Sequence, residues 1–247
     1  MGISSLKVLA LSFWSFILVI VSTNGAAPEP LFPAMFVFGD SIVDNGNNNY
    51  LNTLAKANYF PYGIDFNQGP TGRFCNGKTI VDFLGDLVGL PYLPPFVETY
   101  RGSSTILRGV NYASAAGGIM EETGQNLGGR FSLSQQVQNF ETTLRQLKNQ
   151  MNEHDLSQYL AKSLMFMIPG SNDYINNYLL PGLYPTSYIY DPKTYADLLI
   201  KRYSDTNSGF AEFGTQEVLA GRNWTTWLHT KPKSLRSCST REMCVFC

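Results

Sequence analysis

The chain has 247 residues, of which 44% are hydrophobic and 15% are charged, and its formal net charge is −1. This length and apolar content are sufficient for one sizeable hydrophobic core, and they favour one large domain over two. The charge is almost balanced, without a basic face or an acidic run, so nucleic acid is excluded as an expected partner.

The first 26 residues are typical of a secretory signal peptide. Lys7 precedes an apolar run over 8–21, and small residues follow at 25–27. A membrane-spanning helix needs about 20 apolar residues, whereas this run is shorter and includes Ser12 and Ser15. We therefore expect cleavage near Gly25 to Ala27 and an exported mature chain without an integral membrane segment. An uncleaved anchor or a buried helix is the alternative.

The cysteines of an exported chain can form disulfides. Of the four, Cys75 stands alone, whereas Cys238, Cys244 and Cys247 lie within the last ten residues. Their pairing cannot be assigned from this distribution. Together with His229 the last three resemble a zinc site only in part, because a second well-spaced pair is missing. We expect no metal.

Hydrophobic periodicity predicts strands that alternate with helices. Three short apolar runs each end in a polar turn, and amphipathic segments separate them. Asp191 is the expected N-cap of the last helix and Pro192 its first residue. Such alternation predicts an α/β fold with three layers, in which helices cover both faces of a central parallel sheet. The strands are expected within 34–40, 109–120 and 163–174, and the helices within 79–91, 132–151 and 191–203.

The three predicted strands end in turns that carry chemically useful groups. These turns are Gly39-Asp40-Ser41, Gly117-Gly118 and Gly170-Ser171-Asn172-Asp173. Because ligands bind beyond the carboxyl ends of parallel strands, the turns are expected to share one rim. Ser41 would offer a hydroxyl, while the backbone N–H groups of Ser41 and Gly118 and the amide of Asn172 could stabilise an oxyanion, as acyl transfer requires.

Three segments carry a family resemblance. "FVFGDSIVDNGNNN", "NYASAAGGI" and "IPGSNDY" resemble the first three conserved blocks of the GDSL esterases/lipases, the plant type in particular. The likeness covers about 33–204, and the hydrolase elbow G-x-S-x-G is absent. Ile42 replaces the leucine that is usual in the namesake motif.

The resemblance implies a fold, an activity and a set of site residues. The fold is a GDSL-hydrolase or flavodoxin-like α/β/α domain, and the activity is hydrolysis of small-molecule or lipid acyl esters without metal or cofactor. Ser41 becomes the nucleophile and an oxyanion donor, and Gly118 and Asn172 become the other donors. Gly39, Asp40 and Gly170 are expected to support them.

The fourth family block, Asp-x-x-His, supplies the general base and does not occur here. The two histidines, His154 and His229, follow Met151 and Thr226 by three residues instead of an aspartate. We expect His154 to be a solvated residue in a loop or at a helix start. Residues beyond Ser204 show no sustained periodicity, which suggests a domain that is truncated or alternatively spliced.

The sequence therefore predicts a signal peptide over 1–26, a partial hydrolase domain over 27–204 and a divergent, poorly structured tail over 205–247. The expected function is a secreted serine esterase that is impaired because the base is missing. The alternatives are a non-catalytic truncated product and a secreted protein that binds lipid or, through the asparagine run 45–49, carbohydrate. We expect that run to stabilise the Ser41 loop. Acyl length and oligomeric state stay open.

Overall fold

The computed structural model describes residues 29–100, 106–212 and 217–220. The fold described here is that of the chain from Leu31 onward. The expected signal peptide, His229 and the last three cysteines lie outside the described residues. Within the described ranges, no helix combines the length and the apolar character that crossing a membrane requires.

The fold is built on a parallel sheet. Its strands are β1 (Met35–Gly39), β2 (Gly109–Asn111), β3 (Leu164–Ile168) and β4 (Glu217–Ala220). They are arranged in the order β2-β1-β3-β4, with Met35 aligned to Gly109 on one side and to Leu164 on the other. After β2 the chain crosses over β1 to form β3, as in flavodoxin-like folds, so a topological switch point lies between β1 and β3.

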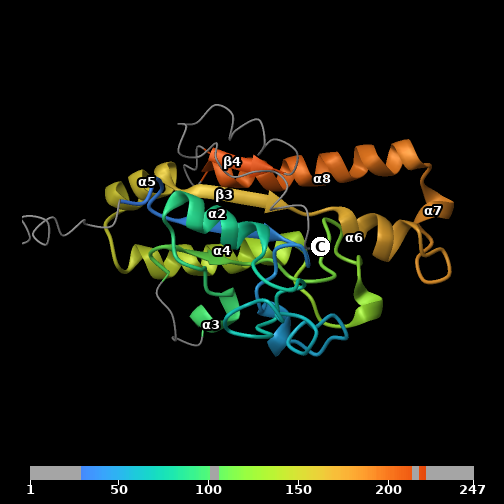
Figure 1. Ribbon diagram of the computed structural model, residues 1–247. Coiled ribbons are helices and arrows are strands. Elements are labelled where there is room, and N and C mark those ends of the chain that lie inside the picture. The colour runs from blue at the N-terminus through green and yellow to red at the C-terminus, as the bar shows by residue number, and fades with distance from the viewer. Residues whose placement is uncertain (1–28, 101–105, 213–216, 221–247) are drawn as a thin grey trace, which may run out of the picture. The chain divides into compact units, whose positions relative to one another are not determined.

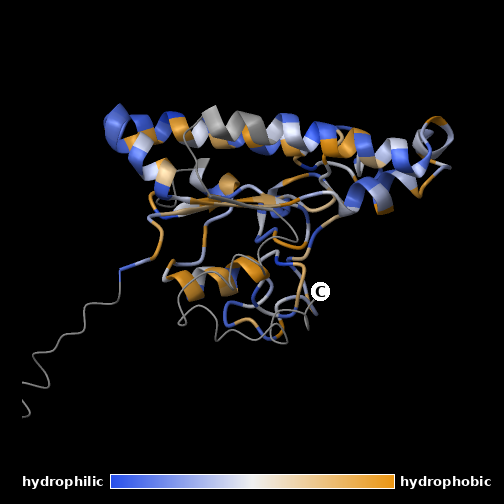
Figure 2. Cartoon of the chain, turned by 90° about the horizontal axis from the view of Figure 1, so that it is seen from above, coloured by the Kyte–Doolittle hydropathy of each residue, from blue (hydrophilic) through white to orange (hydrophobic). Residues whose placement is uncertain are grey.

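Helices lie on both sides of this sheet (Figures 1 and 2). The three-layer α/β/α prediction is thereby confirmed. The helices are α2 (Ile80–Val88), α3 (Phe96–Tyr100), α4 (Leu133–Lys148), α5 (Glu153–Lys162), α6 (Ser171–Asp173), α7 (Thr186–Ile189) and α8 (Pro192–Glu212). Short 3₁₀ turns η1 (Asn47–Tyr50) and η2 (Gln125–Leu127) and a π-helical turn η3 (Tyr174–Tyr178) complete the described elements.

Local capping explains where the main helices begin. The Thr79 hydroxyl accepts from the backbone N–H of Asp82, whose carboxylate accepts in return from Thr79, which is a capping box at the start of α2. At α8 one Asp191 oxygen accepts from the N–H groups of Lys193 and Thr194 at 3.0 and 3.1 Å. The predicted N-cap and the proline at the first helical position are thus confirmed.

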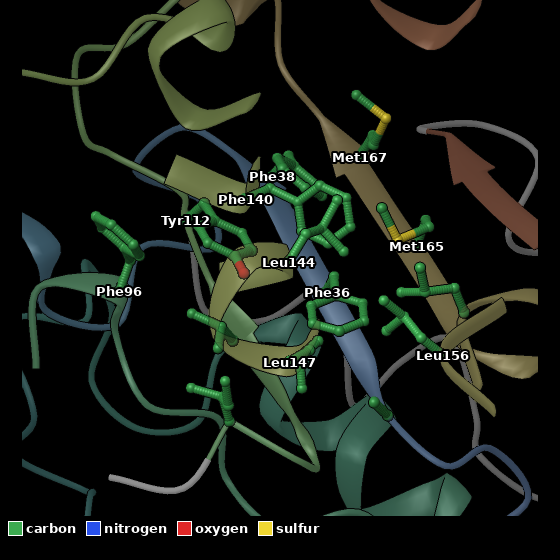
Figure 3. Packing of buried hydrophobic residues seen from close by; sticks show 14 of the residues in the cluster. Phe36, Phe38, Phe96, Tyr112, Phe140, Leu144, Leu147, Leu156, Met165 and Met167 are labelled. Atoms are coloured by element: carbon green, nitrogen blue, oxygen red, sulfur yellow. The ribbon is translucent and has the colours of Figure 1, made fainter. Parts of the chain in front are cut away.

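The strands bury side chains on both faces, which is why they are apolar without alternation. On one face Phe36 and Phe38 of β1 pack with α4 and α5, and on the other Met35 and Val37 pack with α2. The ring of Phe140 on α4 lies 5.1 Å from that of Phe36. Figure 3 shows this aromatic cluster beside β1, with methionines of β3 completing it.

The structure continues beyond the boundary that the sequence suggested at Ser204. Helix α8 runs on to Glu212, and β4 then pairs in parallel with β3, Leu164 being aligned with Glu217. The apolar pattern of this helix is weak, and β4 has only four residues, so neither gives a strong periodic signal. Residues 221–247 lie outside the described part of the chain.

Candidate active site

Hydrogen bonds join the three polar turns at the carboxyl ends of β1, β2 and β3. The Ser171 hydroxyl donates to an Asp40 carboxylate oxygen at 2.5 Å, linking the turn after β3 to the turn that holds Ser41. The Asn172 amide donates to the Gly117 carbonyl at 2.9 Å, linking the turn after β3 to the loop after β2. These turns meet at the switch point between β1 and β3, and α6 follows β3 directly (Figure 1).

Ser41 stands in a tight turn at the end of β1 and is half-buried. The N–H groups of Val43 and Asp44 both donate to the Asp40 carbonyl, at 3.2 and 3.0 Å. Among the described residues, neither the hydroxyl nor the backbone N–H of Ser41 has a hydrogen-bond partner. Both groups are therefore available to a bound molecule.

Gly39 and Gln136 fix the backbone that leads to Ser41. The Gln136 side chain accepts from the Gly39 N–H and donates to the Gly39 carbonyl, both at 2.9 Å. A Cβ at Gly39 would come within 2.8 Å of the Val43 side chain. The close packing of this turn accounts for the glycine before Asp40.

Gly118 is the second residue of the rim with an available donor. Its carbonyl accepts from Leu133 at the start of α4, whereas within the described chain its N–H has no acceptor. A Cβ at Gly118 would lie 2.5 Å from Thr123 and 2.7 Å from an oxygen of Asp173. Side chains from two elements thus approach this backbone closely, and only glycine leaves room for them.

Asn172 is only 3% exposed, and its side chain is held at both ends. Its nitrogen donates to Gly117, and its oxygen accepts from Asn176 at 2.6 Å. A carboxamide nitrogen carries two hydrogens, so one N–H of Asn172 stays uncommitted. Gly170 precedes α6 with φ of 122°, a conformation that favours glycine.

Asp173 fixes the loop that contains Gly118. Its carboxylate accepts from the N–H groups of Ile119 and Met120 at 2.8 and 2.9 Å and from the Thr123 hydroxyl at 2.8 Å. Burial raises the pKa of Asp173, while these hydrogen bonds oppose the rise. Asp173 thereby couples the position of Gly118 to the adjacent Asn172.

Asp40 and Asp44 are buried carboxylates with structural partners. Burial raises the pKa of Asp40, and its hydrogen bond with Ser171 lowers it in part. Burial likewise raises the pKa of Asp44 to about 6. Asp44 accepts from Gly46 at 2.8 Å and from Ala115 at 3.0 Å, so it ties the Ser41 loop to the loop after β2.

The asparagines that follow Ser41 use their amides to hold backbone. Asn47 donates to the carbonyls of Asn111 and Ala113 at 2.9 and 2.8 Å, and Asn48 donates to those of Ala55 and Ala115. This run therefore stabilises the loop, as the sequence suggested.

The structure does not bring His154 to this rim. His154 is exposed at the start of α5, and its ring Nε2 lies 2.9 Å from the Gln158 amide nitrogen. Helix α5 leads into the first residue of β3, which is the opposite end of the strand from Ser171. Within residues 29–100, 106–212 and 217–220, no three potential metal ligands are arranged to hold an ion.

The sequence alone did not predict the contacts of two residues that support this site, Gln136 and Ser171. Gln136 lies three residues after Leu133 and four before Phe140, on the buried side of α4. A polar residue on an apolar helix face is a signal that could have identified it. Ser171 has no such signal, because its contact with Asp40 joins residues far apart in the chain.

Comparisons with known proteins show which family the chain belongs to. The sequence model of the GDSL-like lipase/acylhydrolase family matches residues 35–225. A GDSL esterase/lipase of Arabidopsis thaliana is 56% identical over 88% of this chain and 57% of its own length. GDSL esterase/lipase 7 of the same plant is 54% identical, over 78% of this chain and 54% of its own length. The chain spans about half the length of these relatives. With a matching family model and relatives of such identity, the chain belongs to the GDSL esterase/lipase family.

Proposed function

We propose that this chain is a serine hydrolase of carboxylic acyl esters, with Ser41 as the nucleophile. The N–H groups of Ser41 and Gly118 and the Asn172 amide would bind the oxyanion. The observation that carries the proposal is that each of these groups retains an uncommitted donor on one rim, where its neighbours are hydrogen-bonded to each other. Three preorganised donors suit the charge that develops on a carbonyl oxygen.

The reaction begins with attack of the Ser41 oxygen on the ester carbonyl. A bond forms between that oxygen and the acyl carbon, the bond to the alcohol oxygen breaks, the serine proton passes to solvent, and the departing alkoxide takes a proton from solvent. Water then attacks the acyl carbon, which releases the carboxylic acid and restores the Ser41 hydroxyl. Asp40, Gly39 and Gly170 hold the backbone that presents the reacting groups. The family block that supplies the general base, Asp-x-x-His, does not occur in the sequence, and His154 lies away from the Ser41 rim, at the start of α5. We infer that hydrolysis is impaired, because serine is a weak nucleophile without a base.

The domain plan and location are part of the same proposal. Residues 1–26 would direct export and be removed, 27–204 would form the partial hydrolase domain, and 205–247 would be the divergent segment. The apolar run after Lys7 supports export. The alternative function is a secreted, non-catalytic protein that binds lipid or carbohydrate. It is favoured by the remoteness of His154, the only histidine among the described residues.

The test is the reaction of the full chain with p-nitrophenyl acetate, beside Ser41→Ala and His229→Ala. Nitrophenolate leaves without help from an acid, whereas deacylation requires an activated water. We expect a slow burst of about one equivalent of nitrophenol per chain, followed by very slow turnover, which is the sign of an accumulating acyl-enzyme.

The variants separate the possible outcomes. Ser41→Ala is expected to abolish the burst, and a burst that persists in this variant would refute the role of Ser41. Rapid turnover that is lost in His229→Ala would show that a base is present and that the hydrolase is intact. Absence of any Ser41-dependent reaction would favour the non-catalytic alternative.

A further inference from the structure

A cavity of about 430 Å³ lies on the β2 side of the sheet, and none of the three oxyanion donors lines it. Part of its wall is the segment 91–95, which is attached to the edge of the sheet because the Asn111 N–H of β2 donates to the Pro94 carbonyl at 3.0 Å. The volume falls in the range of roughly 300 to 1,000 Å³ that is usual for small-molecule sites.

Asn45 lines this cavity and carries an oxygen without a hydrogen-bond donor. The residue is only 4% exposed, and its side-chain nitrogen donates to the Leu93 carbonyl at 2.5 Å. Among the described residues its side-chain oxygen is unpartnered, whereas that of Asn47 accepts from the Val97 N–H. Because a buried acceptor without a partner is costly, a ligand that supplies an O–H or N–H group here would be favoured.

Arg73 fixes the polar side of the cavity. It is 5% exposed and donates to both Asp82 carboxylate oxygens, at 2.7 and 2.8 Å, and to the Thr71 hydroxyl oxygen at 2.9 Å. Within the described part of the chain, the Thr71 hydroxyl hydrogen has no acceptor, and the exposed carboxamide of Gln68 has no partner. The lining thus offers an acceptor at Asn45 and donors at Thr71 and Gln68.

The charges around the cavity balance. The positive charge of Arg73 is neutralised by Asp82, and the other ionised side chains of the described lining, Glu98 and Arg108, have opposite signs. The rest of the wall is the run 91–95, which carries no charge. A ligand with a net charge therefore gains little attraction there.

We propose that this cavity binds a neutral sugar, at a site separate from Ser41. Hydroxyl groups both donate and accept, so they match the Asn45 oxygen and the donors of Thr71 and Gln68. The C–H groups of a pyranose ring would pack against the apolar run 91–95. A hydrocarbon chain would instead leave the Asn45 oxygen without a partner. This inference goes beyond the proposed hydrolase and does not rest on it.

The test measures binding of methyl pyranosides to the full chain and to its Ser41→Ala variant by saturation-transfer NMR titration. The probes are the methyl β-glycosides of glucose, galactose and xylose, with methyl β-glucuronide as the charged comparison. We expect at least one neutral glycoside to bind both proteins equally, and the glucuronide to bind more weakly than the tightest neutral probe. No binding of any neutral probe, tighter binding of the glucuronide, or loss of binding in Ser41→Ala would overturn the proposal.

The chain offers a matched pair of controls. Gln68 and Gln138 are both exposed, but only Gln68 lines the cavity, whereas Gln138 lies on α4. Gln68→Ala is expected to weaken sugar binding about fivefold through loss of a hydrogen bond, and Gln138→Ala to leave it within about twofold. Equal effects of the two variants would overturn the assignment. Sugar binding in a protein whose Ser41 never becomes acylated would support this site and refute the proposed hydrolase.

Discussion

The asparagine run 45–49 and the rim formed by Ser41, Gly118 and Asn172 are alike in sequence, since both are polar and both follow apolar strands. The two regions differ in their hydrogen bonds. Both hydrogens of the Asn47 side-chain NH₂ group are donated to backbone carbonyls, whereas Ser41 and Gly118 retain unpaired N–H groups among the described residues. Polar composition alone therefore does not distinguish a side chain that supports the backbone from a residue whose donor is available to a ligand. The two are distinguished by whether each hydrogen-bond donor already has an acceptor.

The largest expected effect lies at the rim. Asn172→Ala removes one oxyanion donor, and we expect the rate of Ser41 acylation by p-nitrophenyl acetate to fall about 10²- to 10³-fold. The measurement is the rate constant of the nitrophenol burst. Asn176→Ala is the control, because the Asn176 side chain donates to the oxygen of Asn172 and not to the Asn172 nitrogen that would bind the oxyanion. If the two variants slow the reaction equally, the donor role of Asn172 is wrong.

Substitutions in the asparagine run 45–49 should lower the stability of the fold, in contrast to the effect on acylation rate expected at the rim. Asn47→Ala leaves the buried carbonyls of Asn111 and Ala113 and the N–H of Val97 without their partner, and we expect the free energy of unfolding to fall by about 3 kcal/mol. Asn49→Ala removes one bond, to Thr71, and should cost about 1 kcal/mol. Urea unfolding measures both. A loss for Asn47→Ala no greater than that for Asn49→Ala would contradict the supporting role.

Asp44 connects the two regions, and its contribution to the stability of the fold depends on pH. Its pKa is raised to about 6 in the folded chain, above the ordinary value of about 3.9. The folded state therefore holds this proton more tightly. The resulting stability is complete below about pH 4 and is lost as pH rises through about 6.

Asp44→Asn removes this titration. Between pH 4 and 7 the free energy of unfolding of the wild type should fall by up to about 3 kcal/mol relative to the variant. Urea unfolding at several pH values gives the two slopes, and comparison of slopes cancels the constant cost of placing an amide beside the Ala115 N–H. Parallel slopes, or a wild type that gains stability relative to the variant over this range, would exclude the effect.

The smallest expected effect is that of Ser171. Ser171→Ala removes the donor to Asp40, and we expect a loss of about 1 kcal/mol in stability and less than tenfold in acylation rate. Because that bond lowers the pKa of Asp40, the pKa should rise further in the variant. NMR titration of the Asp40 carboxyl checks this, with Ser204→Ala on the exposed side of α8 as the control. An unchanged Asp40 titration would show that the contact has no influence.

The sequence alone predicted the three-layer fold and the meeting of the three polar turns at one rim, for physical reasons. Apolar runs such as Met35 to Gly39 are buried on both faces, and the periodicity of α4 is strong, so local patterns predict them. Three family blocks in order predict Ser41, Gly118 and Asn172 as the site residues, and their roles stay predictions. The contact of Gln136 with Gly39 joins residues 97 apart, which no local pattern encodes.

Helix α8 and β4 illustrate the remaining gap. The helix has a weak apolar stripe, its start is fixed by the Asp191 cap, and its first half packs with the cluster of Tyr195, Tyr178 and Leu199. Strand β4 is defined by pairing with β3, which is a tertiary property. The sequence pattern therefore predicted where α8 begins but carried no signal for where it ends or for β4.

The most direct test of the account locates the acyl group after reaction with p-nitrophenyl acetate. Digestion and mass spectrometry of the full chain identify the peptide that carries it. The account predicts one acetyl group, on the Ser41 hydroxyl, and an unmodified asparagine run at 45–49. Acetylation elsewhere while Ser41 stays unmodified would show that this rim does not hold the nucleophile.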